Sequence, residues 1–364
     1  MKRFDALLVG YYGMHNTGDD MLMAAAAAGA RRHLMANNIA ATAARGSDVC
    51  YALNISAIQS KKQKFRGHDR ILKYIAATNS RHIVIGGGSV FHTAKDIRQK
   101  LQYLKLAGSN KHCAVGVGLG PFVDSEAERV CADFLNRCDF TGLRDRVSFD
   151  IARSIAPNAN VALTFDLAPG MSIEPDFVSA LAPNRDNAIG VALCPVERFS
   201  GDENAELHRN SVIANTLNKL YKQEKFEVRL IDFNGHPDLG DHPVHQDLRQ
   251  KLKNIPCEII HYAADPMRAV NQISRLRGIL AMRLHAAVFA YLSGTPAIVL
   301  NYHPKCHNWC RDIGQSEDFG MDTIDIDGAK LETSLARILA DDYTFPQLAI
   351  GAAAEKAMSN WSSY

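Results

Sequence analysis

Three side chains that can bind anions or move protons lie near one another late in the sequence: Arg283, His285 and Lys305. Arginine offers a planar fork of donors that matches a phosphate or a carboxylate, and lysine offers a compact positive charge. Histidine is the one of the three that readily exchanges a proton near neutral pH. These residue types predict an anion site with a proton donor beside it.

Two apolar strands must position these side chains. Residues 278–282 have the pattern of a buried strand and residues 286–292 that of a helix, so Arg283 and His285 fall at a strand-to-helix junction. The amino terminus of a helix presents unpaired N–H groups and a partial positive charge, which favours bound anions. Residues 296–300 form the next apolar strand, and Lys305 follows it.

Composition limits the class of protein. The chain has 364 residues, of which 47% are hydrophobic, enough for two domains of ordinary size. A net charge of +2 gives no global field for nucleic acid, so any anion site must be local. The longest apolar runs are far shorter than the roughly 20 residues that a bilayer requires. Eight dispersed cysteines favour reduced core thiols in a cytosolic protein over a disulfide framework.

Strand and helix patterns alternate along the chain, which is typical of parallel sheets covered by helices. A segment rich in Pro, Asp and Asn at residues 168–187 interrupts the alternation, which then restarts. We therefore expect an α/β protein with two Rossmann-like domains facing a cleft. The expected boundaries are 1–175, 176–345, and a closing helix at 346–364 that returns to the first domain.

The first strand runs into a glycine loop that contains Gly13, Asn16, Asp19 and Asp20. No Gly-Lys-Ser/Thr follows, so the loop is not a Walker loop, and its two aspartates would repel a phosphate. We expect it to contact a neutral, hydroxyl-rich ligand. The alternative is that Asn16 or Thr17 only caps the following helix.

Two further glycine turns are expected after strands, at residues 86–89, which include Gly87 and Gly88, and at 116–121. Together with the first loop they suggest a floor along which a ligand lies close to the backbone. Arg144, after the strand at residues 140–143, is equally consistent with a cleft residue and with an exposed ion pair.

A metal site must also be considered at residues 303–310. His303, Cys306, His307 and Cys310 would share one helical face. Zinc sites usually take ligand pairs from separate segments, so we expect no metal here.

The sequence resembles the polysaccharide pyruvyl transferase family. The resemblance rests on motifs at both ends of the chain, with the glycine turns between them: Gly10-Tyr11-Tyr12-Gly13 with Asn16, Gly18, Asp19 and Asp20; Arg283-Leu284-His285; Gly294-Thr295-Pro296; and Tyr302-His303-Pro304-Lys305. It implies a GT-B-like pair of domains and transfer of a pyruvate unit from phosphoenolpyruvate to sugar hydroxyls, forming a ketal and releasing phosphate, without an organic cofactor.

The resemblance also implies roles for the residues above. Arg283, Lys305 and Tyr302 would belong to the phosphoenolpyruvate site in the second domain, and His285 would protonate the donor. Asp19 or Asp20 would orient or deprotonate the sugar.

One position departs from the family pattern. Many members carry an arginine before the proline that ends the second domain's first strand, where this chain has Cys194 before Pro195. Arg198 is the nearest cation that could contact the same anion. Two alternatives stay open: a GT-B glycosyltransferase that uses a nucleotide-sugar donor, and a non-catalytic glycan-binding relative.

The acceptor is expected to be a glycan or a lipid-linked saccharide, with the protein in the cytoplasm or at the inner face of the membrane. The basic stretch 61–66 is a candidate for peripheral membrane contact, although such runs are usually solvated faces. The acceptor sugar, its linkage and the oligomeric state stay open.

Overall fold

The computed structural model describes residues 3–44, 47–60, 62, 65–108 and 111–363, and it divides the chain into two compact units. The first unit contains residues 1–14, 19–174 and 351–364, and the second contains 15–18 and 175–350. Lys61, Gln63 and Lys64 of the basic stretch lie outside the described residues.

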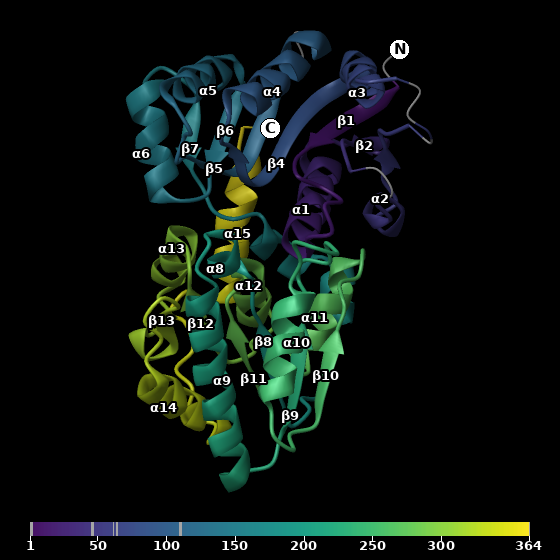
Figure 1. Ribbon diagram of the computed structural model, residues 1–364. Helices are drawn as coiled ribbons and strands as arrows, with labels where there is room; N and C mark the ends of the chain where they lie inside the picture. Colours follow the sequence, from purple (N-terminus) through teal and green to yellow (C-terminus); the bar gives the residue numbers. More distant parts are fainter. Residues whose placement is uncertain (1–2, 45–46, 61, 63–64, 109–110, 364) are drawn as a thin grey trace. The chain divides into compact units, whose positions relative to one another are not determined.

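The first unit contains a seven-stranded sheet in the order β3-β2-β1-β4-β5-β6-β7 (Figure 1). Every neighbouring pair in it is parallel. Its strands are β1 (Phe4–Val9), β2 (Ile39–Ala41), β3 (Ser56–Ala57), β4 (Ser80–Phe91), β5 (Cys113–Leu119), β6 (Phe140–Leu143) and β7 (Val161–Leu163). Its helices are α1 (Thr17–His33), α2 (Val49–Ala52), α3 (His68–Thr78), α4 (Ala94–Ala107), α5 (Ser125–Arg137), α6 (Arg146–Ile155), η1 (Ala168–Ile173), α15 (Ile350–Met358) and η3 (Ser359–Trp361).

The second unit contains a six-stranded sheet in the order β10-β9-β8-β11-β12-β13, again with parallel neighbours. Its strands are β8 (Ala188–Ala192), β9 (Glu227–Ile231), β10 (Cys257–Ile260), β11 (Gly278–Ala281), β12 (Ala297–Asn301) and β13 (Gly320–Asp322). Its helices are α7 (Pro175–Ala180), α8 (Val196–Phe199), α9 (Glu203–Gln223), α10 (His242–Lys251), α11 (Pro266–Ser274), α12 (Leu284–Leu292), α13 (Pro304–Ile313), η2 (Glu317–Phe319) and α14 (Gly328–Leu339).

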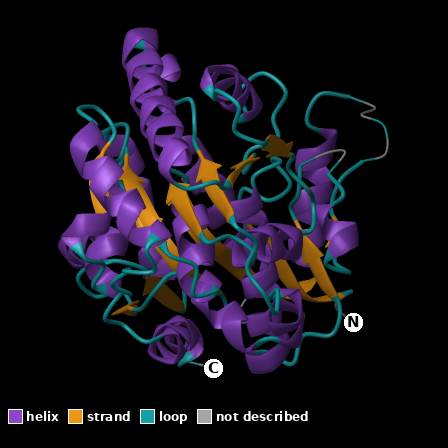
Figure 2. Ribbon diagram, turned by 90° about the horizontal axis from the view of Figure 1, so that it is seen from below, coloured by secondary structure: helices purple, strands orange, loops and turns teal. Residues whose placement is uncertain are grey.

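Helices cover the strands of both sheets (Figure 2). The central strands β5 and β8 are consequently buried along their whole length, which explains their continuous apolar sequences. Aspartates fix where several helices begin. Asp124 and Asp202, for example, accept backbone N–H groups from the first turns of α5 and α9.

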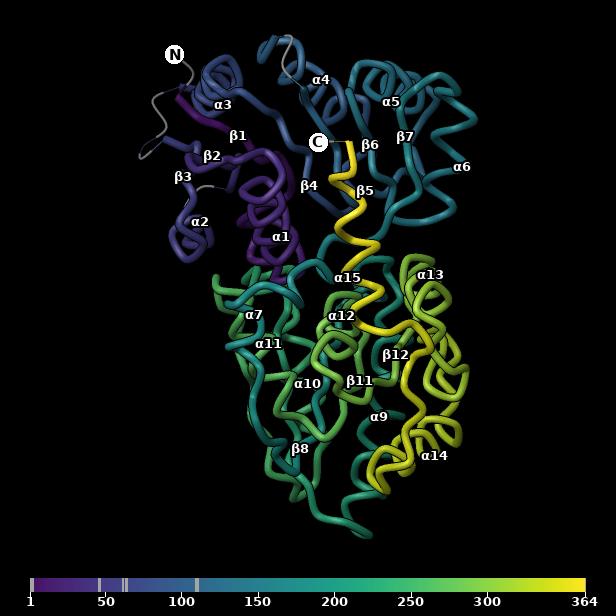
Figure 3. Tube along the Cα trace, turned by 180° about the vertical axis from the view of Figure 1, so that it is seen from behind, coloured from purple at the N-terminus to yellow at the C-terminus, as the bar shows by residue number. Residues whose placement is uncertain are grey.

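The end of the chain packs into the first unit, where it lies beside β5 and β6 (Figure 3). The amide oxygen of buried Asn360 accepts a hydrogen bond of 2.6 Å from the Gly116 N–H and one of 2.7 Å from the Thr164 hydroxyl. Its amide nitrogen donates to the Phe165 carbonyl at 2.9 Å. Asn360 therefore ties the end of the chain to β5 and to the segment that follows β7.

The prediction of a glycine turn at residues 86–89 is wrong, because strand β4 continues through these residues to Phe91. Gly87 and Gly88 have φ angles of +67° and +80° within the strand. A Cβ at Gly87 would lie 2.9 Å from the Cβ of Leu22 on α1. The glycines are thus explained by close packing of α1 on β4. Gly116 and Gly118 likewise lie inside β5 and not in a turn.

Candidate functional site

Arg283 and His285 lie at the junction between β11 and α12, as the sequence predicts. Arg283 is the N-cap residue of α12 and has extended backbone angles. Its N–H group and that of Met282 both point to the Ala192 carbonyl at the end of β8, at 3.2 and 2.9 Å. Two adjacent parallel strands therefore fix where the Arg283 side chain leaves the backbone.

The guanidinium of Arg283 is held by a buried carboxylate, that of Asp241. Nε of Arg283 lies 3.1 and 3.2 Å from the two carboxylate oxygens, and Nη2 also contacts Oδ1. Burial alone would lower the pKa of Arg283, but the nearby Asp241 carboxylate outweighs it and raises that pKa. Arg283 is therefore a charged group held in a fixed orientation, and in the described part of the chain its Nη1 makes no hydrogen bond.

Asp241 is itself fixed by the loop after β9. Its Oδ2 accepts hydrogen bonds from the N–H groups of Phe233 and Asn234, at 3.0 and 2.9 Å. The side chain is fully buried. A buried carboxylate with two backbone donors is rigid, so the Arg283 orientation does not depend on a flexible partner.

His285 lies on the first turn of α12, next to the short segment 15–18 that belongs to the second unit. A Cβ at Gly18 would lie only 2.3 Å from Nδ1 of His285, so the Gly18 backbone packs directly on the imidazole. Phe289, one turn later on α12, flanks the ring at a centroid distance of 6.3 Å. A glycine at position 18 is thus required by the position of His285.

Lys305 and Tyr302 follow β12. Nζ of Lys305 lies 5.3 Å from the centre of the Tyr302 ring, a cation–π contact. Burial raises the pKa of Tyr302, so this phenol stays protonated at neutral pH. His303 begins α13, where its Nδ1 accepts the Lys305 N–H at 3.2 Å.

Near Cys194, where many family members carry an arginine, lies a buried cation that belongs to helix α9. Arg209 on α9 is fully buried, and its Nη1 lies 3.3 Å from the Cys194 carbonyl oxygen and 2.9 Å from Oε1 of Glu197. Burial raises the pKa of the Cys194 thiol to about 11, so Cys194 carries no charge at neutral pH. Arg198 forms ion pairs with Glu206 at 2.5 Å and Asp247 at 3.2 Å. The guanidinium of Arg198 is thus engaged with two carboxylates.

Asp19, Asp20 and Gly13 lie in the first unit at the start of α1. Asp20 is fully buried and accepts the Gly13 N–H at 3.1 Å, so it holds the glycine loop in place. Asp19 is less buried, and its Oδ1 is 3.6 Å from where a Cβ at Gly88 would lie. Of the two aspartates, Asp19 is the more exposed.

Asn16 and Arg144 have distinct local partners. The side-chain oxygen of Asn16 accepts the Gly18 N–H at 3.0 Å, and Asn16 forms an isolated β-bridge with Asn234 in the second unit. Arg144, in the first unit, donates to the Ser89 hydroxyl at 2.8 Å and lies 3.5 and 3.9 Å from Asp145 and Asp166. Only a tenth of the Arg144 side chain is exposed, which excludes the expected alternative of an exposed ion pair.

The described residues that could hold a metal ion are Asp232, His242 and His261. They lie at the carboxyl ends of β9 and β10 and at the start of α10. The histidines and cysteines at residues 303–310, which are close in sequence, are a different set, and the sequence predicts no metal there. There, Cys306 is buried and the His307 imidazole pairs with Asp322 at 2.9 Å.

The sequence profile of the polysaccharide pyruvyl transferase family matches residues 16–304, which is most of the chain. The chain belongs to the polysaccharide pyruvyl transferase family. Membership makes this protein a transferase of polysaccharide biosynthesis. No curated protein sequence matches the chain.

Solved structures similar to this pyruvyl transferase family member include two UDP-GlcNAc 2-epimerases. The enzyme from Methanocaldococcus jannaschii is 14% identical with a TM-score of 0.61, and the match covers 99% of each chain. The enzyme from Neisseria meningitidis, bound to UDP-GlcNAc, is 13% identical with a TM-score of 0.61 and covers 99% of this chain and 100% of its own.

A third similar structure is Anabaena HepE in complex with UDP-glucose. It is 12% identical with a TM-score of 0.57, and the match covers 99% of this chain and 95% of that one. At such identities the likeness shows a shared GT-B-like fold. No described helix of the family member is both long and apolar enough to cross a membrane.

Two aspartates of the second unit were not predicted from the sequence as site residues. Asp241 and Asp232 hold side chains of the second unit in place, and neither belongs to a motif that the resemblance includes. Only one signal pointed to them: aspartates occur just after an apolar strand and just before a helix. An aspartate at such a position usually only caps the helix. The ion pair between Asp241 and Arg283 could therefore be recognised only from the tertiary structure.

Proposed function

We propose that this protein transfers a pyruvate unit from phosphoenolpyruvate to sugar hydroxyls of a glycan or glycolipid precursor. The observation that carries the proposal is that Arg283 and His285 both lie at the amino end of α12. Arg283 is held by Asp241 with Nη1 left to donate, and His285 lies two residues later on the same turn. A fixed cation beside a proton-exchanging group suits a donor that is both an anion and an enol ether.

In this proposal Arg283 and Lys305 bind the phosphate and carboxylate of the donor. Charge-assisted hydrogen bonds of this kind contribute about 1.5–3 kcal/mol each. The N–H groups at the start of α12 add to the attraction. Tyr302 supports Lys305 through its ring, and its neutral hydroxyl can donate a hydrogen bond.

The chemistry begins with a proton. The His285 imidazolium protonates C3 of the donor, which makes C2 electrophilic, and a first sugar hydroxyl adds to C2 as its proton passes to a base. The bond from C2 to the phosphate oxygen then breaks and phosphate leaves. A second sugar hydroxyl adds to C2 and closes the ketal. One acceptor proton replaces the proton that His285 gave, and the other leaves on phosphate.

We assign the acceptor side to the first unit. Asp19, which is less buried than Asp20, orients or deprotonates the sugar hydroxyl, while Asp20 fixes the glycine loop. Gly13, Gly87, Gly88 and Arg144 of the first unit remain proposed contacts of the sugar, and so does Asn16, which belongs to the second unit. Arg198 is proposed to assist the donor only if it leaves its ion pairs with Glu206 and Asp247.

The decisive experiment incubates the protein with phosphoenolpyruvate and a panel of glycans, and measures phosphate release and the mass gain of a pyruvate ketal. Arg283→Ala and His285→Ala should each abolish both signals, and loss of the general acid alone should cost roughly a hundred- to ten-thousand-fold. Arg311→Ala, which removes an exposed arginine of α13, is the control and should leave turnover unchanged.

Two results would contradict the proposal. Full activity of the Arg283→Ala and His285→Ala variants would remove these residues from the site. Tight binding of UDP in calorimetry, without turnover of phosphoenolpyruvate, would favour a nucleotide-sugar donor.

A further inference from the structure

One carboxylate in the second unit is surrounded by three imidazoles. Asp232 follows β9, and its Oδ2 lies 3.2 Å from Nδ1 of His242 and 3.0 Å from Nδ1 of His261. The ligand atoms that Asp232, His242 and His261 offer all lie within 4.8 Å of one another. We propose that these three residues form a binding site for a divalent transition-metal ion, of which Zn²⁺ is the reference case.

The distances between donor atoms suit such an ion. Zinc binds imidazole nitrogen and carboxylate oxygen at about 2.0–2.2 Å. Two ligand atoms at that distance are therefore about 3.0 Å apart at a right angle and about 3.4 Å apart in a tetrahedron. The separations of 3.2 and 3.0 Å from the Asp232 carboxylate fall in this range, and the ligand atoms of the two histidines lie within 4.8 Å of each other.

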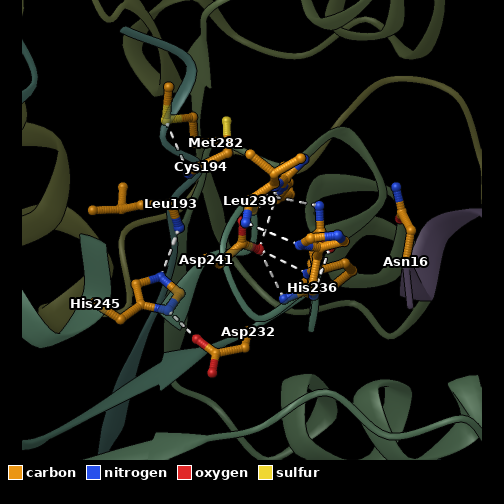
Figure 4. A network of polar contacts seen from close by, with 12 residues as sticks. Asn16, Leu193, Cys194, Asp232, His236, Leu239, Asp241, His245 and Met282 are labelled. Atoms are coloured by element: carbon orange, nitrogen blue, oxygen red, sulfur yellow. Dashed lines mark hydrogen bonds and ion pairs between the residues drawn. The ribbon is translucent and has the colours of Figure 1, made fainter. Parts of the chain in front are cut away.

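Behind the site, His245 holds the carboxylate in position. Nε2 of His245 accepts the Leu193 N–H at 3.0 Å, so the ring proton must lie on Nδ1. Nδ1 then donates to Oδ1 of Asp232 at 2.6 Å, and both side chains are almost fully buried (Figure 4). This contact fixes Asp232 and leaves Oδ2 to face the other two histidines. Partners of this kind orient metal ligands in known sites.

The other two ligands are accessible. The side chain of His242 is 37% exposed and that of His261 is 69% exposed, so an ion can enter from solvent. A cavity of about 310 Å³ adjoins the site, and its lining includes Asp232, His261, Thr17, Tyr262 and Arg268. Two imidazoles and one carboxylate leave coordination positions open for water or for an anionic ligand, as in catalytic and not in closed structural sites.

The proposed metal site adjoins the residues that hold Arg283. His242 follows Asp241 in the sequence, and Phe233, whose N–H binds Asp241, follows Asp232. An ion that ties His242 to Asp232 would therefore stiffen the loop between β9 and α10. The inference needs no particular donor or acceptor and stands apart from the proposed pyruvyl transfer.

The test uses the full chain after treatment with a chelator. Calorimetric titration with Zn²⁺ should show one equivalent bound, with a matching rise in melting temperature. Titration with Co²⁺ should give d–d bands of a site with nitrogen and oxygen ligands and no thiolate charge-transfer band. The double variant His242→Ala/His261→Ala should bind Zn²⁺ on the order of 100-fold more weakly, or not at all.

The matched control is His307→Ala. His307 is also a partly exposed histidine beside one carboxylate, Asp322, and it belongs to the set at residues 303–310, where the sequence predicts no metal. Its loss should not change the affinity. The proposal is overturned if the wild-type protein binds no stoichiometric Zn²⁺, if the double variant binds as tightly as wild type, or if His307→Ala abolishes binding and Co²⁺ shows thiolate ligation.

Discussion

The two units differ in the residues that stand out within and just after their strands. In the first unit the conspicuous residues are glycines that make room for neighbours of the same unit. A Cβ at Gly87 would meet Leu22 at 2.9 Å, and one at Gly116 would meet Leu167 at 2.7 Å. In the second unit they are charged side chains held in pairs, such as Arg283 with Asp241.

This difference shows how glycines and charged residues near strands should be interpreted in a sequence. These glycines within parallel strands are explained by packing, since a neighbouring side chain leaves no space for a Cβ. A buried charge has no packing purpose and costs free energy unless it is paired. Charged residues at strand ends therefore point to chemistry more strongly than glycines do, and four substitutions test that contrast.

The largest effect is expected for Asp241→Asn. Breaking a buried ion pair costs about 3–5 kcal/mol in full burial, and somewhat less here because Arg283 is 18% exposed. We expect a lower stability of the second unit and, in the glycan assay, a loss of kcat and a higher KM for phosphoenolpyruvate. Asp318→Asn, at an exposed ion pair with Arg337 in the same unit, is the control. A lower KM in Asp241→Asn would mean that Asp241 competes with the donor for Arg283.

Gly87→Ala tests the packing explanation in the first unit. The φ angle of +67° and the 2.9 Å approach to Leu22 should together lower the free energy of unfolding by about 2–4 kcal/mol. Chemical denaturation measures this loss. Adding Leu22→Ala should recover only part of the loss, because it removes the contacts with the Leu22 methyl groups but leaves the 2.9 Å contact with Cβ and the backbone strain. If Gly87→Ala is as stable as wild type yet inactive, this glycine contacts substrate and the contrast between the units fails.

Gly18→Ala is expected to act on chemistry more than on stability. The new Cβ would lie 2.3 Å from Nδ1 of His285 and would displace the ring that is proposed to carry the proton. A misplaced catalytic group costs on the order of 100-fold in rate. We expect kcat to fall by roughly this factor while the melting temperature changes little. Unchanged kcat would show that the position of His285 is unimportant.

The smallest effect is expected for Lys100→Met in α4. This substitution tests whether a buried charge in the first unit lowers the stability of the fold. Lys100 lies 5.6 and 5.8 Å from the Tyr11 and Phe91 ring centres, and burial lowers its pKa to about 8. The folded pKa is below the unfolded value of 10.5, so the charged form destabilises the fold below pH 8 and the penalty fades as the pH rises toward 10.5.

Lys100→Met should therefore be more stable than wild type at pH 7, by about 1–2 kcal/mol. Denaturation of both proteins between pH 7 and 9.5 should show this advantage shrinking as the pH rises. An advantage that grows with pH, or a less stable variant at pH 7, would contradict the assignment.

Much of the secondary structure could be predicted from the sequence because it depends on local patterns. The strand at 140–143 was expected with these bounds and is β6, and the helix expected at 286–292 is α12, which begins two residues earlier. Short elements were missed, among them β3 with two residues and α8 with four, because so few residues carry no period. The glycine turn at 86–89 was misjudged, because only the helix that packs on β4 explains these glycines.

The sequence by itself determined the α/β class, the junction that carries Arg283 and His285, and, through dispersed motifs, the family. These follow from local periodicity and from residue types that the chemistry requires. Tertiary structure decided which charges meet: Asp241 with Arg283 across 42 positions, and Asp232 with His261 across 29. No local pattern in the sequence predicts these pairs. Parallel strands are joined by long helical connections, so residues that meet at the strand ends are far apart in the sequence.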